Sequence, residues 1–218
     1  MTILALDTTS EYGSVALRSS GETIAELALH SREGFAHLIF SAIEEVLQRV
    51  GVGVTEVDCF AATSGPGSFT GVRVGLSAVK GLAEAAGKPA VGVSNLQVLS
   101  SFGKNRLRAV VLDARRGEVY AAVYGADLMP ITSEMVLSFP SWLETLHEPE
   151  YEFITTAGGP FWLGLQGTRF AEMPFTEAPR ALAPAVAQCA ETCEWADPAT
   201  LDANYVRRSD AEQLWRDS

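Results

Sequence analysis

The sequence predicts a duplicated α/β protein with two lobes, each built in the order β-β-β-α-β-α. Two successive sets of short apolar runs, with longer amphipathic segments between some of them, support this prediction. Glycine-rich turns mark the points where the periodicity changes from that of a strand to that of a helix. The second set is less regular than the first. We therefore expect mixed sheets, a cleft between the lobes and a degraded second unit.

The first lobe is assigned to residues 1–100. Alternating apolar and polar residues indicate three strands at its start, and a polar turn at residues 19–22 joins the second strand to the third. A continuous apolar run further on is typical of a buried strand. Strands are predicted over residues 2–6, 13–17, 23–29 and 57–63, and helices over residues 32–50 and 69–86.

The second lobe is assigned to residues 101–218, and the boundary lies between residues 92 and 106, where residues 94–102 are predicted to form a connecting helix. The helix that closes this lobe has an uncertain start because Pro184 lacks a backbone donor. Strands are predicted over residues 107–113, 118–124, 131–137 and 152–156, and helices over residues 140–146 and 181–194.

The composition is that of an ordinary folded protein, with 47% hydrophobic and 20% charged residues. Acidic residues outnumber basic ones by 27 to 16, which gives a formal net charge of −11. A protein that grips nucleic acid by itself usually presents a basic face to the phosphates, so tight direct binding of RNA or DNA is not expected. Short basic clusters, each compatible with a solvated turn, occur at residues 104–108, 115–116 and 207–208.

Features of membrane and secreted proteins are absent from the sequence. No apolar run approaches the roughly 20 residues that a membrane helix needs, and residues 1–7 look like a first strand rather than a leader, so a cytoplasmic protein is expected. The cysteines, Cys59, Cys189 and Cys193, are odd in number and lack the spacing of a disulfide framework. Cys189 and Cys193 lie four residues apart, which is more typical of a helix surface or core than of a metal site.

Residues 64–75, with the sequence SGPGSFTGVRVG, join a predicted strand to a predicted helix through a glycine-rich turn. A helix N-terminus after such a loop is a natural anion site, so one interpretation is a vestigial phosphate loop that includes Gly65, Gly67 and Ser68. The spacing matches neither the Rossmann nor the Walker pattern. A tight turn, in which Gly provides positive φ and Ser68 or Thr70 caps the helix, explains the sequence equally well.

The predicted order of elements is that of the ribonuclease-H-like fold of actin, hexokinase and the heat-shock ATPases. In that fold the first strand ends in an acidic residue, and a turn of small residues then faces a nucleotide phosphate. Here Asp7 ends the first predicted strand, and Thr8 and Ser10 lie in the turn. A carboxylate at this point could hold Mg²⁺ through water. The alternative is that these three residues only satisfy the turn.

Five motifs stand in order along nearly the whole chain: DTTS at residues 7–10, GPGSFTGVRVGL at 65–76, KGLA at 80–83, DARRGEVY at 113–120 and YVRR at 205–208. Together they closely resemble the bacterial TsaB (YeaZ) family. The resemblance implies a subunit of the machinery that places threonylcarbamoyl on the adenosine beside the anticodon of tRNAs reading codons that begin with A. In that family this subunit is not the transferase; it pairs with a larger homologous catalytic subunit, TsaD, and with a small ATPase subunit, TsaE.

The same resemblance implies that the chain forms a homodimer when alone. The net charge of −11 predicts that the chain meets tRNA only through the complex. No cofactor is expected to be bound tightly by the isolated chain, because Asn95 and Leu99 stand at the metal positions of the catalytic relatives. A nucleotide at the partner interface is possible.

A missing metal pair supports a non-catalytic role. The catalytic relatives carry His-x-x-x-His shortly after the strand that follows the second helix, because two imidazoles one helical turn apart can share a metal. Asn95 and Leu99 occupy those positions here, and Leu cannot bind a metal. The three histidines, His30, His37 and His147, have no ligand spacing.

The two long predicted helices carry more apolar surface than a single core face requires. Small residues on the second helix would let another helix approach closely, although both helices could instead be buried within their own chain. In the resembled family, helices in these positions pair with the catalytic subunit or with a second copy. The partner interface is therefore expected at Phe35, His37, Leu38, Ile39, Ala42, Arg73, Val74, Gly75, Ala78 and Leu82.

Two other function classes are considered. A stand-alone ATP-dependent phosphotransferase would use Asp7 and the loop at residues 65–71, but the second half offers only residues 158–160 as an adenosine loop. A peptidase of this fold lacks support, since the sequence has neither a His-x-x-x-His nor a Gly-x-Ser-x-Gly pattern. The sequence favours a non-catalytic activating subunit that assembles through its helix pair. We expect the substitutions Gly75→Arg and Ala78→Glu to break this assembly.

Overall fold

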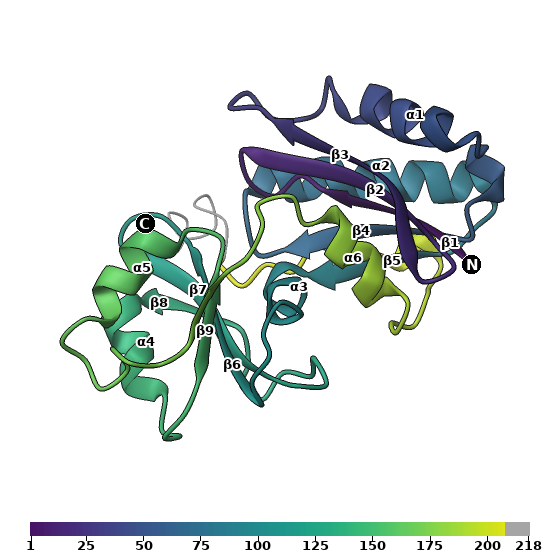
Figure 1. Ribbon diagram of the computed structural model, residues 1–218. Coiled ribbons are helices and arrows are strands. Elements are labelled where there is room, and N and C mark those ends of the chain that lie inside the picture. Colours follow the sequence, from purple (N-terminus) through teal and green to yellow (C-terminus); the bar gives the residue numbers. More distant parts are fainter. Residues whose placement is uncertain (208–218) are drawn as a thin grey trace. The chain divides into compact units, whose positions relative to one another are not determined.

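The computed structural model describes residues 1–207 (Figure 1). The chain divides into two compact units, each with its own five-stranded sheet. The first unit contains Met1–Asn95 and Arg180–Asn204, and the second contains Leu96–Pro179 and continues from Tyr205. None of the helices within the described residues has the length and apolar composition required to cross a bilayer.

The first unit has a mixed sheet of strand order β3-β2-β1-β4-β5. β1 pairs antiparallel with β2 and parallel with β4, so the sheet changes from antiparallel to parallel at its central strand. This is the mixed sheet that the sequence predicts. The strands are β1 (Thr2–Asp7), β2 (Tyr12–Ser19), β3 (Glu22–His30), β4 (Cys59–Gly65) and β5 (Ala90–Ser94), and the helices are α1 (Ile39–Val50), α2 (Phe69–Ala86) and α6 (Ala183–Ala190), with 3₁₀ turns at Val54–Glu56 and Pro198–Thr200.

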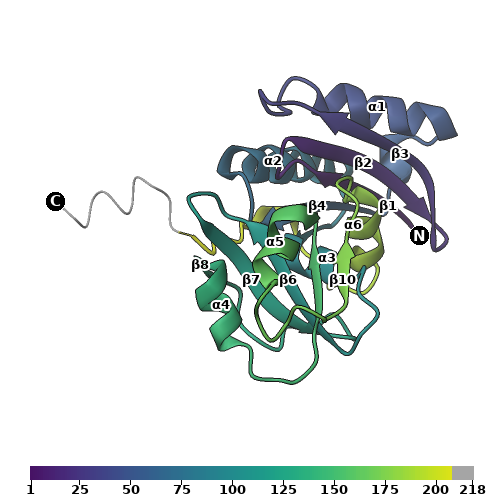
Figure 2. The same ribbon diagram turned by 60° about the vertical axis from the view of Figure 1, so that its left-hand side comes forward.

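Helices cover both faces of the first sheet (Figures 1 and 2). Side chains alternate along a strand, and those of Leu4, Leu6 and Val15 join the core beneath α1 and α2. Ser14 points to the opposite face, where its Oγ accepts a hydrogen bond from Ala183 N at 2.9 Å. α6 therefore belongs to the first unit. The prediction that the helix over residues 181–194 closes the second lobe is wrong, because apolar periodicity does not indicate which sheet a helix covers.

The first helix is shorter than the predicted span of residues 32–50. α1 begins at Ile39, and the preceding Gly34 adopts a left-handed φ of 87°, which interrupts any helix upstream. Phe35 lies in this irregular segment with its side chain 1% exposed. A side chain at Gly13 would meet the Phe35 ring at 2.8 Å, so the two residues pack closely.

The second helix has the predicted bounds of residues 69–86. Ser68 is its N-cap, and the Ser68 Oγ accepts a hydrogen bond from Gly71 N at 3.3 Å, which confirms the predicted capping role. Gly87 ends the helix in a left-handed conformation with a φ of 63°. Local sequence chemistry thus determines both ends of α2.

The second unit repeats the topology of the first. Its sheet has the order β10-β9-β6-β7-β8, in which β6 pairs antiparallel with β7 and parallel with β9. This equivalence confirms the predicted duplication. The strands are β6 (Leu107–Asp113), β7 (Glu118–Gly125), β8 (Met135–Ser138), β9 (Glu152–Thr155) and β10 (Phe175–Glu177), and the helices are α3 (Asn95–Ser100), which lies at the division of the units, α4 (Phe139–Thr145) and α5 (Gly158–Leu165).

The prediction of a candidate adenosine loop at residues 158–160 is wrong, because these residues form the first turn of α5. Proline is well tolerated in a first helical turn, so a Gly-Gly-Pro sequence does not require a loop. Phe161 of this helix packs against Phe139 with ring centroids 5.3 Å apart, and Trp142 meets Phe153 at 6.0 Å. An aromatic core therefore holds α4 and α5 on one face of the second sheet.

A buried carboxylate anchors the segment that enters the second sheet. Glu152 is 3% exposed, and its Oε2 accepts hydrogen bonds from Lys104 N at 2.6 Å and Asn105 N at 2.7 Å. The hydroxyl of Thr176 donates to its Oε1 at 2.7 Å. Burial alone would raise the pKa of Glu152, but these hydrogen bonds and the charge of Arg108 outweigh it and lower the pKa.

Glu152→Gln should destabilise the second unit by about 2 kcal/mol at pH 7, because the charge-assisted hydrogen bonds are lost. A lowered pKa contributes stability above the ordinary value of 4.5 that is lost as the pH falls through the folded value. The difference in unfolding free energy between variant and wild type should therefore shrink on acidification, measured by urea melts from pH 7 to 3. Glu150→Gln, at an exposed position, is the matched control; an equal loss in both variants would contradict the role of Glu152.

Candidate functional site

The glycine-rich loop lies where the sequence predicts it, between β4 and α2. Gly65 has a φ of 106°, which favours glycine, and a side chain there would meet Asn204 O at 2.8 Å. Asn204 N in turn donates to Ser64 O at 2.7 Å. The loop is therefore packed under the chain segment that follows α6, and the prediction that glycine is needed for positive φ and close approach is confirmed at Gly65.

Asp7, at the end of β1, is the centre of a buried polar network. Its Oδ1 accepts hydrogen bonds from Thr9 N at 3.1 Å, Thr9 Oγ1 at 2.7 Å and Thr63 Oγ1 at 2.8 Å. Asn95 Nδ2 donates to Thr9 Oγ1 at 2.6 Å, and Asn95 Oδ1 accepts from Gly65 N at 3.1 Å. The network joins the ends of β1, β4 and β5, three neighbours in the first sheet.

The N-terminal part of α2 packs directly on the turn after β1. Ser68 N donates to Thr9 O at 2.7 Å, and Thr8 Oγ1 donates to Gly71 O at 2.7 Å. A side chain at Gly67 would meet Thr9 at 2.8 Å, and one at Gly71 would collide with Thr8 O. The polar groups that an anion would need here are thus occupied by the chain itself.

The polar residues predicted for a phosphate loop at this turn have partners within the first unit. Asp7 is 1% exposed, so its carboxylate is not open to a hydrated Mg²⁺ ion. Ser10 is exposed, but its hydroxyl donates to Tyr12 O at 2.8 Å and accepts from Tyr12 N at 3.0 Å. The residues predicted as a vestigial phosphate loop therefore serve as internal packing and turn residues.

Burial raises the pKa of Asp7, although the hydrogen bonds from Thr9, Thr63 and Asn95 act in the opposite direction. The buried carboxylate thus favours its protonated form more than an exposed aspartate does. Such a shift is common at catalytic sites, but here the shifted group is enclosed by its own hydroxyl donors.

The two residues at the positions of the missing metal pair have structural roles. Asn95 is part of the Asp7 network, and Leu99 is fully buried. Within residues 1–207, no group of three His, Cys, Asp or Glu side chains is arranged to hold a metal ion. Cys59 is also enclosed, and burial raises the pKa of its thiol to about 12, so it is a poor nucleophile.

The predicted partner interface divides into inward-facing and outward-facing residues. Phe35, Ile39, Ala42, Gly75 and Ala78 are buried in the first unit's own fold. A side chain at Gly75 would meet Thr8 Oγ1 at 2.6 Å. These five residues do not belong to the candidate surface, because small or apolar residues in or next to a helix pack equally well on the chain's own sheet.

The other five predicted residues reach the surface: His37 and Arg73 are exposed, while Leu38, Val74 and Leu82 are half-buried. Burial also shows which residues the prediction missed, namely Phe40 and Phe69, at 58% and 42% exposed. Both are apolar residues off the core-facing stripe of a helix, which is the pattern that could have revealed them.

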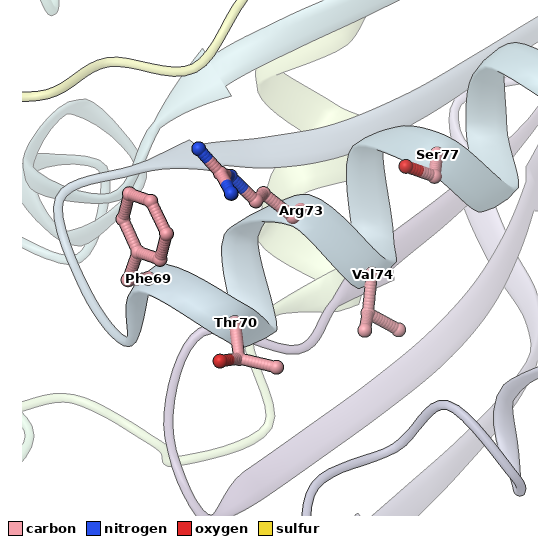
Figure 3. A pocket seen from close by; sticks show the side chains of 5 residues that line it. All are labelled: Phe69, Thr70, Arg73, Val74 and Ser77. Carbon is pink, nitrogen blue, oxygen red and sulfur yellow. The ribbon is translucent and has the colours of Figure 1, made fainter.

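A shallow pocket lies along the N-terminal half of α2 and is lined by Phe69, Thr70, Arg73, Val74 and Ser77 (Figure 3). The guanidinium carbon of Arg73 lies 3.8 Å from the centre of the Phe69 ring. Thr70 and Val74 extend to the other side of the helix in this view, and Ser77 lies one turn further along. The pocket and the exposed residues beside it form the candidate site.

An uncharged stripe begins at this pocket and continues along α2. It consists of Thr70, Val74, Ser77, Gly81 and Ala85 at helical spacing. Four of them are exposed and Val74 is half-buried. A side chain built at Gly81 would meet nothing within 4 Å. We call these five residues the α2 stripe. Its small side chains leave the helix backbone open to a close neighbour.

Comparisons with known proteins agree with this architecture. The family model described as "TsaD: tRNA N6-adenosine threonylcarbamoyltransferase" matches residues 29–175. The Escherichia coli K12 "tRNA threonylcarbamoyladenosine biosynthesis protein TsaB" is 36% identical over 167 residues, which cover 73% of this chain and 72% of that protein.

Solved structures resemble most of the chain. YeaZ from Pseudomonas aeruginosa superposes with a TM-score of 0.76 at 26% identity, over 94% of this chain and 99% of that one. The ethanolamine utilization protein EutJ from Carboxydothermus hydrogenoformans superposes with a TM-score of 0.55 at 12% identity, over 86% of this chain and 89% of that one, a likeness of fold alone.

Asp7→Asn should fold, because an amide oxygen can accept the hydrogen bonds that Asp7 Oδ1 accepts. A raised pKa gives a contribution to stability that is complete below the ordinary value of 3.8 and is lost as the pH rises through the folded value. The unfolding free energy of Asp7→Asn relative to wild type should therefore increase from pH 4 to pH 8 in urea melts.

Asp7→Ala serves as the second variant, since it leaves the Thr9 and Thr63 hydroxyls without their acceptor at a cost of about 1–3 kcal/mol. Glu33→Gln, at an exposed position, controls for the change in net charge. A relative stability of Asp7→Asn that falls as the pH rises would contradict the assignment.

Proposed function

Because this chain belongs to the TsaB (YeaZ) family, we propose that it is a non-catalytic, activating subunit of the machinery that forms N6-threonylcarbamoyladenosine in tRNA. The modified base is the adenosine beside the anticodon, on its 3′ side, in tRNAs reading codons that begin with A. The observation that carries this proposal is the 36% identity to the E. coli TsaB protein over 72% of its length.

The non-catalytic role is supported by what the first unit does with its polar residues. Asp7, Thr8 and Thr9 hold α2 and the strand ends together, so they are not available to a nucleotide. Asn95 and Leu99 stand where the catalytic relatives carry their metal pair, and both are buried. We therefore propose that the isolated chain binds ATP weakly or not at all, and that any nucleotide of the assembled complex requires the partner subunit.

The catalytic partner in this proposal is TsaD, which is related to this chain in sequence, since the TsaD family model matches residues 29–175. The docking surface is the exposed part of the helix pair, with the α2 stripe at its centre and the exposed Phe40 and Phe69 as further apolar residues of the same two helices. Uncharged small residues can be dehydrated at low cost, and exposed aromatic side chains are typical of interfaces, which suits a helix-to-helix contact.

Charged residues border the α2 stripe along the helix. Arg73, Lys80 and Glu84 follow one another at helical spacing, and Arg73 is stacked on Phe69. Such a border favours a particular partner and orientation more than it adds affinity. In the absence of TsaD the same surface would serve a homodimer, and TsaE would join the assembled complex.

The two alternatives are not favoured. A phosphotransferase would need the turn after β1 open to a phosphate, and Gly67 and Gly71 are instead packed on it. A peptidase would need a nucleophile with its base, yet the thiol of Cys59 is buried with a raised pKa. A role in the tRNA modification machinery agrees both with the sequence relatives and with the closed turn after β1.

Gly81→Arg should abolish assembly without unfolding the chain. The site has room for a side chain, and arginine is a better helix former than glycine. A charged side chain at the centre of a dehydrated contact should weaken association with TsaD at least about tenfold. The measurements are circular dichroism, a thermal melt, titration calorimetry with TsaD and the tRNA modification rate.

Two further variants serve as controls for Gly81→Arg. Gly75→Arg should unfold the chain, because Gly75 faces Thr8 inside the fold. Gln188→Arg, at an exposed position on α6 on the other face of the sheet, should leave folding, TsaD binding and modification unchanged. If Gly81→Arg still binds TsaD and activates modification, the α2 stripe is not the docking surface.

A further inference from the structure

The turn between β6 and β7 holds two arginines in an unfavourable backbone conformation. Arg115, Arg116 and Gly117 have φ values of 63°, 56° and 78°, so three successive residues are left-handed. Asparagine, aspartate and glycine are the usual residues of such hairpin turns, because a larger side chain crowds the backbone there. The hairpin itself therefore gives no reason for arginine at either position.

The equivalent turn of the first unit has a different environment. β6 and β7 occupy the places in their sheet that β1 and β2 occupy in theirs. Asp113 ends β6 as Asp7 ends β1, and its Oδ1 accepts a hydrogen bond from Arg115 N at 2.7 Å, two residues on, as Asp7 accepts one from Thr9 N. Thr9 is buried beneath α2, whereas Arg115 and Arg116 are exposed.

A third arginine lies beside this turn. Arg115 N donates to Asp113, and Glu118 pairs with Arg207, whose Nη1 also donates to Ala114 O at 2.8 Å. Arg115, Arg116 and Arg207 thus lie in or next to one turn, in a chain whose formal net charge is −11. Arg208, the second residue of the predicted basic cluster at residues 207–208, lies outside the described residues.

We propose that the Arg115–Arg116 turn binds the phosphodiester backbone of the RNA substrate once the chain is assembled with its catalytic partner, an inference that rests on the proposed function. Guanidinium groups match phosphate oxygens in a bidentate geometry and stay charged at all physiological pH values. Contacts to phosphates position an RNA without reading its sequence. The acidic remainder of the chain repels RNA, so this contact acts only when the partner supplies the main affinity.

The test replaces the charges with the residues that such a turn prefers. Arg115→Asn combined with Arg116→Gly should fold with an unchanged or raised melting temperature, because Asn-Gly suits left-handed φ. In complex with TsaD, this variant should bind tRNA about tenfold more weakly at low salt. The slope of log affinity against log salt should become shallower by about 1.5, as expected for two lost phosphate contacts.

The matched control removes two positive charges at the other end of β6. Lys104→Asn with Arg106→Asn changes exposed residues by the same net charge and should leave tRNA affinity and its salt slope unchanged. Equal behaviour of the two double variants would overturn the proposal, as would loss of TsaD affinity in the turn variant, which would make the turn a protein contact. A wild-type complex that neither binds nor modifies tRNA would instead overturn the proposed function, and with it this inference.

Discussion

The first unit depends on one interaction, the enclosure of the Asp7 carboxylate by Thr9, Thr63 and Asn95. The hydrogen bond between Asn95 and Thr9 joins residues 86 positions apart in the sequence, and the network closes the edge of the sheet at which β1, β4 and β5 end. A buried carboxylate is costly unless hydrogen bonds compensate it, so each donor is needed for the fold. The same donors hold the turn on which α2 rests, and they thereby position the surface of α2 that we propose as the docking surface.

Duplication of one topology has produced two units with separate roles. In the first, α2 lies over the turn after β1, and glycines allow the backbones to touch. In the second, the corresponding turn after β6 is exposed and carries arginines. The same aspartate-anchored turn is thus a packing element in one unit and a charged surface in the other. A fold therefore does not determine a function, which lies in the side chains at equivalent points.

The distribution of charge suits a subunit that acts within an assembly. The α2 stripe is uncharged, which suits a protein contact, whereas the excess of acidic residues disfavours RNA on most of the surface. These properties support the proposal that the chain contributes surface and position to a reaction rather than reacting groups. This agrees with its relation to TsaB proteins and with the closed turn beside Asp7.

The sequence by itself determined the features that arise from local chemistry. The cap at Ser68, the bounds of α2, the glycine at positive φ at Gly65 and the first four strands of each unit were predictable, because each depends on residues within a few positions of one another. The fifth strand of each unit, β5 and β10, was not among the predicted strands. The left-handed φ of Gly34, which shortens the first helix, is also a local feature, but the prediction of that helix rested on apolar periodicity alone. Only the tertiary structure decided that α6 covers the first sheet and that Gly75 and Ala78 face inward. It also decided that Asp7 is enclosed, since these outcomes depend on contacts between distant segments that no local pattern encodes.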